Sequence, residues 1–371
     1  MSLRIPDHVL RISPYVPGKP VEEAARQTGL HDIVKLASNE NPLGPSPRAV
    51  EAARDAALRA NRYPDGSGYA LRQALAARHG FPASQVVLGN GSTELVEIVA
   101  KTFLGAGRTA VVADRAFIMY RIAVLVMNAP LISVPLKDER HDLAAMAAAC
   151  DARTALVYIG NPNNPTGRHV GSAAFAAYFA ALPPHVLTVI DEAYFDYVEA
   201  EDYPDGLEFV RAGRNVLVLR TFSKIHGLAG LRMGYGLTAP EVARGLEAVR
   251  SPFNTSSIAQ AAALAALEDR EHVARSRAEN SREARHVQAE LALRRLDFVP
   301  SVANFVLVHT PLAGEELTQR LLALGVIVRP MEAYGYRDAV RVSFGTRAEN
   351  ERFLAALDQV LGSAAAARRA P

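Results

Sequence analysis

Lys224 has the surroundings of a reactive amine. It follows a predicted strand, Val216 to Arg220, and ligands of α/β sheets bind beyond the carboxyl ends of the strands. Two hydroxyl residues, Thr221 and Ser223, precede it, and Arg232 comes eight residues later. Hydroxyl groups and a guanidinium suit a phosphate, so the segment predicts an amine beside a bound phosphate ester. A solvated surface lysine is the alternative, and this segment alone does not decide between the two.

A glycine-rich turn lies earlier in the chain, between a predicted strand and a predicted helix. The turn is Gly89-Asn90-Gly91-Ser92-Thr93, the strand covers Val86 to Leu88, and the helix covers Glu94 to Phe103. Free backbone N–H groups at the positive end of a helix make an anion cradle, here with Ser92 and Thr93 in it. The spacing matches neither a P-loop nor the GxGxxG dinucleotide fingerprint. A helix N-cap without any ligand is the alternative.

A carboxylate directly follows another predicted strand, Leu187 to Ile190. It belongs to Asp191, and Tyr194 comes three residues later. A carboxylate at that place can keep a pyridine nitrogen protonated, which makes the ring an electron sink for a carbanion. Lysine, phosphate cradle and carboxylate together suit pyridoxal 5′-phosphate (PLP), whose phenolic oxygen the tyrosine would reach. A helix cap or a Mg²⁺ ligand would also explain the carboxylate.

A turn rich in asparagine and proline, Asn161 to Gly167, follows the predicted strand Ala155 to Ile159. Its composition is that of an ordinary turn. Because it follows a buried strand, it also brings an asparagine amide to the same rim of the sheet. Asn164 is therefore a candidate donor to the phenolic oxygen of the cofactor.

The elements that must position these residues alternate between strand and helix. Another apolar strand covers Ala110 to Ala113, and another helix covers Ala173 to Ala181. Runs of β-branched residues that alternate with helices predict a mostly parallel sheet with helices on both faces. The predicted fold class is α/β, with a large domain over residues 36–250 and a smaller α+β domain.

The pattern changes after Pro252. Residues Ser257 to Leu296 are rich in Ala, Leu, Glu and Arg and predict one long helix. Strands and helices alternate again to the end of the chain: strands Phe298 to Pro300, Phe305 to His309 and Val340 to Phe344, and helices Glu315 to Leu324 and Ala348 to Leu361. The smaller domain is expected to comprise residues 251–371 and residues 1–35, which form an N-terminal arm with a helix near Val21 to Thr28.

Length and composition restrict the class of protein. The length of 371 residues favours two domains. The net charge is only +2, from 41 Lys plus Arg and 39 Asp plus Glu, and therefore points to neither nucleic acid nor an acidic membrane as partner. The only cysteine is Cys150, so neither an intrachain disulfide nor a thiolate metal cluster is expected, and no metal site is predicted. No apolar run reaches ~18 residues, and residues 1–10 lack the apolar core of a signal peptide. A cytoplasmic location is expected.

The four motifs together carry a family resemblance. The Asn-Pro-Thr-Gly turn, the Asp-x-x-Tyr and the Ser-Lys with an arginine eight residues later occur in this order, and they are similar to those of the fold-type I aminotransferases. Further segments resemble the histidinol-phosphate aminotransferases within that family: Lys35 to Gly44, Arg62-Tyr63-Pro64-Asp65, Val328-Arg329-Pro330 and Arg341-Val342-Ser343. The resemblance covers about Ser13 to Leu361. It implies a PLP-transferase fold, a PLP cofactor and a homodimer with shared sites.

The resemblance also implies a role for each matching residue. Lys224 would form the Schiff base with PLP and move protons, and Asp191 would pair with the pyridine nitrogen. Asn164 and Tyr194 would hold the phenolic oxygen, and Phe117 stands at the ring-stacking position, where the family often has tyrosine. The phosphate would be held by Ser92, Thr93, Thr221, Ser223 and Arg232, with Tyr63 reaching in from the neighbouring subunit. Arg341 would take the substrate carboxylate, and Tyr15, Asn41 and Arg329 would be further substrate contacts.

The implied reaction is transamination of L-histidinol phosphate with 2-oxoglutarate in histidine biosynthesis, by a ping-pong mechanism. Aromatic amino acids are an alternative donor class, for which Met233, Tyr334 and Tyr336 offer candidate ring contacts. An O-phosphothreonine-type decarboxylase is a second alternative. A non-catalytic PLP-binding module or a phosphate-binding hydrolase would be of another class. A regulatory module would usually add a DNA-binding segment, which this sequence does not contain. A hydrolase would need a catalytic base or a set of metal ligands, and the sequence offers neither.

Overall fold

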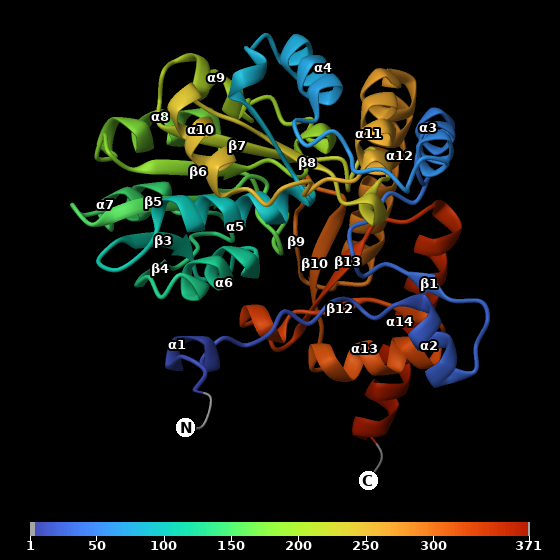
Figure 1. Ribbon diagram of the computed structural model, residues 1–371. Coiled ribbons are helices and arrows are strands. Elements are labelled where there is room, and N and C mark those ends of the chain that lie inside the picture. The colour runs from blue at the N-terminus through green and yellow to red at the C-terminus, as the bar shows by residue number, and fades with distance from the viewer. Residues whose placement is uncertain (1–3, 370–371) are drawn as a thin grey trace.

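The computed structural model describes residues 4–369, which form a large α/β body and a smaller α+β body (Figure 1). The large body contains a seven-stranded sheet in the order β2-β8-β7-β6-β5-β3-β4. Its strands are β2 (Val86–Gly89), β3 (Thr109–Ala113), β4 (Leu131–Val134), β5 (Thr154–Gly160), β6 (Leu187–Asp191), β7 (Val216–Thr221) and β8 (Gly234–Leu237). Only β8 runs antiparallel to its neighbours, so the predicted, mostly parallel α/β sheet is confirmed.

Alternate residues of each strand enter two separate hydrophobic cores because successive side chains point to opposite faces of a sheet. In β7, Val218 belongs to one core and Leu219 to the other. One face is covered by α3 (Pro47–Ala57), α4 (Tyr69–His79), α7 (Leu143–Ala148), α8 (Ser172–Ala181), α9 (Gly206–Arg211) and α11 (Ser257–Glu268). The opposite face is covered by α5 (Gly91–Phe103), α6 (Ile118–Val126) and α10 (Pro240–Val249). Burial on both faces explains why the strands are apolar throughout.

The smaller body is built on a four-stranded antiparallel sheet in the order β12-β13-β10-β9. Its strands are β9 (Phe298–Val299), β10 (Phe305–His309), β12 (Arg329–Pro330) and β13 (Ala339–Ser343), and a parallel pair joins β1 (Val34–Lys35) to β11 (Val326–Ile327). Helices α13 (Gly314–Ala323) and α14 (Arg347–Arg369) complete it. One hydrophobic core joins Val34, Val306 and Phe353, so the segment around β1 packs on the smaller body.

The predicted long helix over Ser257 to Leu296 is wrong in one respect, since the chain forms two helices there. They are α11 and α12 (Arg270–Leu293), and Asp269 between them caps α12 by accepting a hydrogen bond from the backbone N–H of His272 at 3.1 Å. An N-cap residue has non-helical backbone angles, which interrupts the helix. Alternation of apolar residues alone did not reveal this break.

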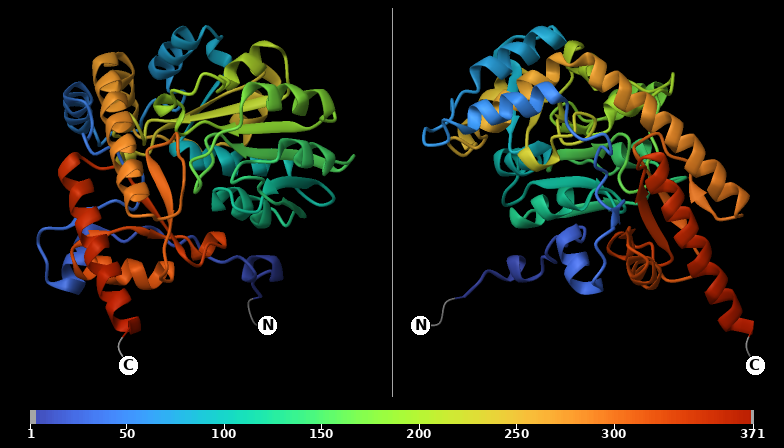
Figure 2. Two further views of the ribbon diagram at one scale, coloured as in Figure 1. Left: turned by 180° about the vertical axis from the view of Figure 1, so that it is seen from behind. Right: turned by 90° about the vertical axis from the view of Figure 1, so that its right-hand side faces the viewer.

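Helix α11 packs with the large body, which differs from the expected division near residue 250. Its buried alanines, among them Ala259 and Ala263, belong to the core on one face of the large sheet. The later part of α12 contributes Ala284 and Leu291 to the core of the smaller body, and Figure 2 shows this long helix running between the two bodies. The packing favours a boundary within α12.

The N-terminal arm crosses from one body to the other. Its first helix, α1 (Asp7–Leu10), lies against α6 of the large body, whereas α2 (Val21–Thr28) packs on the smaller body beside α13. The stretch between these helices passes the mouth of the cavity described below. No helix among residues 4–369 is both long and apolar enough to cross a membrane.

Candidate active site

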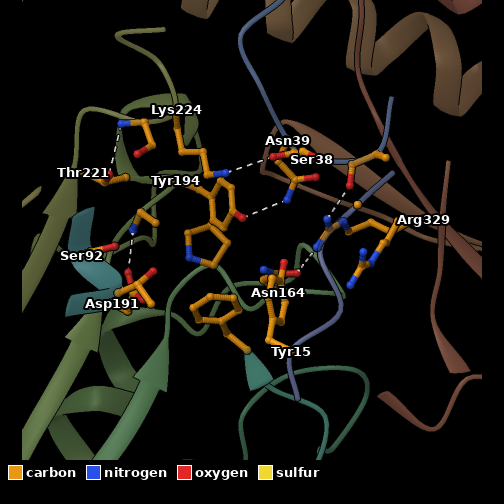
Figure 3. Close-up of a pocket in the computed structure, with 18 of the residues that line it drawn as sticks. Tyr15, Ser38, Asn39, Ser92, Asn164, Asp191, Tyr194, Thr221, Lys224 and Arg329 are labelled. Atoms are coloured by element: carbon orange, nitrogen blue, oxygen red, sulfur yellow. Dashed lines mark hydrogen bonds between the residues drawn. The ribbon is translucent and has the colours of Figure 1, made fainter. Parts of the chain in front are cut away.

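A cavity of about 160 Å³ opens at the carboxyl edge of the large sheet, where that edge faces the smaller body. It is lined by nearly all the candidate residues: Tyr15, Ser92, Thr93, Phe117, Asn164, Asp191, Tyr194, Thr221, Ser223, Lys224, Arg232, Arg329 and Arg341. The carboxyl ends of parallel strands meet at one edge, which is why motifs far apart in sequence converge. In Figure 3, Asp191 and Ser92 lie on one side of the cavity and Arg329 on the other.

Lys224 follows β7 and extends into the cavity. Its Nζ donates a hydrogen bond to the carbonyl oxygen of Ser38 at 3.2 Å and lies 5.6 Å from the centre of the Tyr194 ring. Burial, together with the positive charge of Arg341, lowers the pKa of the Lys224 amine to about 8. A substantial fraction of such an amine is neutral near pH 7–8, which a nucleophile or a proton acceptor requires.

Asp191 ends β6 and is buried. Its Oδ2 accepts a hydrogen bond from the Tyr120 hydroxyl at 2.8 Å, and its Oδ1 accepts one from the backbone N–H of Ala193 at 3.1 Å. Burial raises the pKa of the Asp191 carboxyl to about 6, and the Tyr120 hydrogen bond opposes that rise. Sequence reasoning missed Tyr120, because it lies 71 residues away on α6 and only packing brings it to the carboxylate.

The glycine-rich turn and the segment after β7 form one cradle. Asn90 is the N-cap of α5, so Ser92 and Thr93 lie in the first helical turn rather than capping it. The Arg232 guanidinium lies so close that a Cβ at Gly91 would stand 2.3 Å from its Nη2. Arg232 Nη1 also donates to Ser223 Oγ at 3.2 Å. Hydroxyls, helix N–H groups and a guanidinium face one point, which suits a phosphate.

The opposite side of the cavity joins the two bodies through polar contacts. The Asn39 amide donates a hydrogen bond to the Tyr194 hydroxyl at 2.9 Å. Arg341 on β13 donates to Asn164 Oδ1 at 2.5 Å and to the carbonyl oxygen of Ala37 at 2.9 Å. No motif pointed to Asn39 itself, although it falls in the segment Lys35 to Gly44 that carries part of the resemblance.

Two arginines face each other across neighbouring strands at this side. Arg329 of β12 is the register partner of Arg341 of β13, and both line the cavity. Within the described part of the chain, neither forms an ion pair with a carboxylate. The Nε of Arg341 is buried and has no hydrogen-bond partner among residues 4–369. Like charges directly opposite each other are unfavourable, so an anionic group between them would be stabilising.

Two candidate residues do not line the cavity. The Asn41 amide is buried elsewhere, where it donates to the carbonyl oxygen of Ile225 at 2.7 Å and to Ser276 Oγ at 2.9 Å. Tyr63 is 83% exposed and stacks on Phe253 with ring centroids 4.7 Å apart. Of the three candidate ring contacts, only Tyr334 lines the cavity; Met233 lies in the sheet core, and Tyr336 packs in a small hydrophobic cluster with Tyr334.

A lysine, a buried carboxylate and a phosphate cradle at the carboxyl edge of this sheet are the features of a PLP-dependent transferase. The family model for class I and II aminotransferases matches residues 31–357, and the chain belongs to that family. It is a PLP-dependent aminotransferase.

Relatives and solved structures agree with this assignment. The chain is 50% identical to the histidinol-phosphate aminotransferase of Moorella thermoacetica over 95% of this chain and 92% of the relative. It is 47% identical to that of an Anaeromyxobacter species over 97% of this chain and 99% of the relative. The crystal structure of histidinol-phosphate aminotransferase from Sinorhizobium meliloti in complex with PLP superposes with a TM-score of 0.89 at 30% identity, covering 98% of this chain and 99% of that one.

Proposed function

We propose that the chain transfers the amino group of L-histidinol phosphate to 2-oxoglutarate, giving imidazole acetol phosphate and L-glutamate in histidine biosynthesis. The observation that carries the donor assignment is the pair Arg329 and Arg341, which line the cavity and have no carboxylate partner among the described residues. One such pair suits both a phosphate monoester and a dicarboxylic keto acid. The names of the relatives support the same donor.

The cavity residues fit PLP. Ser92, Thr93, Thr221, Ser223 and Arg232 would hold its phosphate, and Phe117 would stack on its ring. Asp191 would face the pyridine nitrogen, while Asn164 and Tyr194 would face the phenolic oxygen. The fit rests on two observations: a Cβ at Gly91 would collide with the Arg232 guanidinium in the cradle, and the Asp191 carboxylate is buried without a cationic hydrogen-bond partner. When bound, PLP supplies an electron sink that stabilises the electrons left on the substrate Cα after its proton is removed.

Lys224 is the residue that binds the cofactor covalently and moves the proton. Its Nζ lies at the cavity wall beside the Tyr194 ring. Burial keeps its pKa at about 8, so the free amine would accept the proton from the substrate Cα and return it to C4′ of the cofactor. Asp191 would supply a negative charge to the pyridine nitrogen. Asn164 and Arg341, which are hydrogen-bonded to each other, orient the substrate beside the cofactor.

The proposal includes a homodimer with shared sites and a cytoplasmic location. Tyr63 is a surface residue that takes no part in a hydrophobic core, and it lies outside the cavity of its own chain. An exposed aromatic held by stacking on Phe253 suits contact with the site of a second copy. The single cysteine of the chain is typical of a protein that needs no disulfide.

The covalent site can be tested without an activity assay. Reduction of PLP-loaded protein with borohydride, followed by peptide mapping, is expected to place the cofactor on Lys224, one of five lysines in the chain. The Lys224→Ala variant is expected to retain no reducible cofactor and no turnover. Cofactor attached to any other lysine would overturn the assignment.

The donor is tested by rates with 2-oxoglutarate as acceptor. L-Histidinol phosphate is expected to exceed phenylalanine in kcat/KM by at least about tenfold, because a site built for a charged group discriminates strongly against a donor that lacks it. Ping-pong kinetics are expected. A preference for phenylalanine would indicate an aromatic aminotransferase, and release of CO₂ without any keto acid would indicate a decarboxylase; either result contradicts the proposal.

A further inference from the structure

A cluster of three side chains joins the two bodies just outside the cavity. The Tyr336 hydroxyl, from the smaller body, donates a hydrogen bond to the carboxylate of Glu139, which follows β4 in the large body. The Arg115 guanidinium, from the segment after β3, lies over the Tyr336 ring with its Cζ 4.5 Å from the ring centre. We call Arg115, Glu139 and Tyr336 the rim clamp.

The rim clamp combines a buried hydrogen bond to a carboxylate with a cation–π contact. Tyr336 is 3% exposed, and burial together with Glu139 raises the pKa of its phenol, which therefore remains a donor. A hydrogen bond to a carboxylate is stronger than one between neutral groups. The guanidinium over the ring adds a cation–π contact, and Glu139 is near enough to contribute to the raised pKa of Arg115.

The turn that carries Glu139 has an unfavourable backbone. Asp138 and Glu139 have φ values of 51° and 59°, in a region that residues with side chains seldom adopt. Lys137 and Arg140 close the turn through mutual backbone hydrogen bonds of 2.9 Å. Such backbone strain persists only where surrounding contacts fix it. Here one fixing contact is the Tyr336 hydrogen bond.

A second contact leads from the same turn to the active site. The backbone carbonyl oxygen of Glu139 accepts a hydrogen bond from Thr166 Oγ1 at 2.8 Å. Thr166 belongs to the turn that presents Asn164, and Asn163 of that turn donates to the carbonyl oxygen of Arg115 at 3.1 Å. Glu139 and Arg115 therefore each hold both Tyr336 and the asparagine turn.

Tyr336 belongs to the segment that carries the substrate-facing arginines. It lies between Arg329 and Arg341 in the chain and two residues after Tyr334, which lines the cavity. Tyr334 and Tyr336 share one small hydrophobic cluster, against which Ile118 of the large body packs. A displacement of Tyr336 would thus move Tyr334 and the ends of both arginine-bearing strands relative to Asn164.

We propose that the rim clamp is a positioning device, which sets the spacing between Arg329 and Arg341 on the smaller body and Asn164 on the large body. Arg115, Glu139 and Tyr336 touch neither substrate nor cofactor in this role. The inference rests on the proposed function only in that the paired arginines bind the anionic end of a substrate. The phosphate cradle, Asp191 and Lys224 all lie on the large body and do not depend on the clamp.

The test compares Tyr336→Phe and Glu139→Gln with Tyr178→Phe. Tyr178 is a matched control, because its buried hydroxyl is also hydrogen-bonded, at 2.9 Å to Thr188, but it lies in the sheet core. Both clamp variants are expected to raise KM for 2-oxoglutarate by about tenfold or more, as loss of a hydrogen bond to a charged group does. The cofactor dissociation constant should stay unchanged, and kcat should change far less than KM. The Tyr178→Phe control should leave KM unchanged.

Two further measurements separate positioning from a general loss of stability. Hydrogen exchange of residues 331–338 in substrate-free protein is expected to accelerate in both clamp variants and not in the control. The double variant should raise KM no more than Tyr336→Phe alone, because both changes break one contact. An unchanged KM for 2-oxoglutarate in both single variants would overturn the proposal. Use of the keto acid keeps the result independent of which amino donor is correct.

Discussion

Burial decides the acid–base properties of the two residues at the centre of the cavity. It raises the pKa of the Asp191 carboxyl to about 6 and lowers that of the Lys224 amine to about 8. Both shifts favour the neutral form, as removal of water does. Opposing contacts keep Asp191 largely ionised at neutral pH, and the hydrogen bond from Tyr120 is the largest of these. Tyr120 is held in place by stacking on Tyr158, with ring centroids 5.2 Å apart.

The Tyr120→Phe variant tests that contact. Loss of the hydroxyl removes a hydrogen bond to the ionised form, so the pKa of Asp191 should rise above about 6. On acidification, the Asp191 carboxylate is then protonated at a higher pH than in the unmodified protein. PLP affinity of the apoprotein, measured from pH 5 to pH 8 by fluorescence titration, should weaken by about tenfold near pH 6 and recover towards pH 8. An unchanged pH profile would show that Tyr120 only packs against Asp191.

At the scale of the element, α11 is a tightly packed part of the large body. It packs closely against α3, and four of its alanines, Ala259, Ala262, Ala263 and Ala266, form a buried face. Small side chains allow two helices to approach closely, and such a contact has no room for added methylene groups. The same helix leads through Asp269 into α12, which reaches the smaller body. A change in α11 therefore affects the stability of the large body.

The Ala263→Leu variant tests this packing. Ala263 is 0% exposed, so the larger side chain should destabilise the protein by about 1–3 kcal/mol. Urea denaturation of the apoprotein measures the loss. Ala265→Leu in the same helix is the control, because Ala265 is only partly buried, and it should cost much less. Equal losses in the two variants would argue against the close contact.

At the scale of the whole molecule, Tyr63 is 83% exposed and lies outside the cavity of its own chain. In the proposed homodimer, each site combines Lys224 of one copy with Tyr63 of the other. Cyclic two-fold assemblies place the same surface of both copies in contact. A residue that lies outside the site of its own chain can therefore reach the site of the other copy. The net charge of +2 is small enough to allow two copies to associate.

Subunit mixing tests the shared site. Lys224→Ala protein should be inactive, and Tyr63→Ala protein should have low activity. A mixed dimer would contain one site with both native residues, so random exchange of subunits should restore about a quarter of the wild-type sites. Activity is measured after mild denaturation and refolding of the mixture, with each variant treated alone as control. No gain over the Tyr63→Ala protein alone would contradict a shared site.

Much of the fold and of the candidate site could be predicted because the signals are local. Asp191, Asn164 and Lys224 each follow an apolar strand directly, and β-branched runs alternate with helices. Since the carboxyl ends of parallel strands meet at one edge, these residues had to converge. Strand β8 was not predicted, because Gly-Tyr-Gly-Leu has little of the β-branched character that marks a strand.

The amino-acid sequence by itself determined the class of fold, the family and the residues at the ends of the strands, since each depends on neighbours in the chain. Only the tertiary structure decided which distant side chains meet. It brought Tyr120 to Asp191 and Asn39 to Tyr194, placed Asn41 outside the cavity, and joined Glu139 to Tyr336. These contacts depend on how separate elements pack, and periodicity within one segment carries no information about its partner in space. The same limit explains why α11 was assigned to the smaller body.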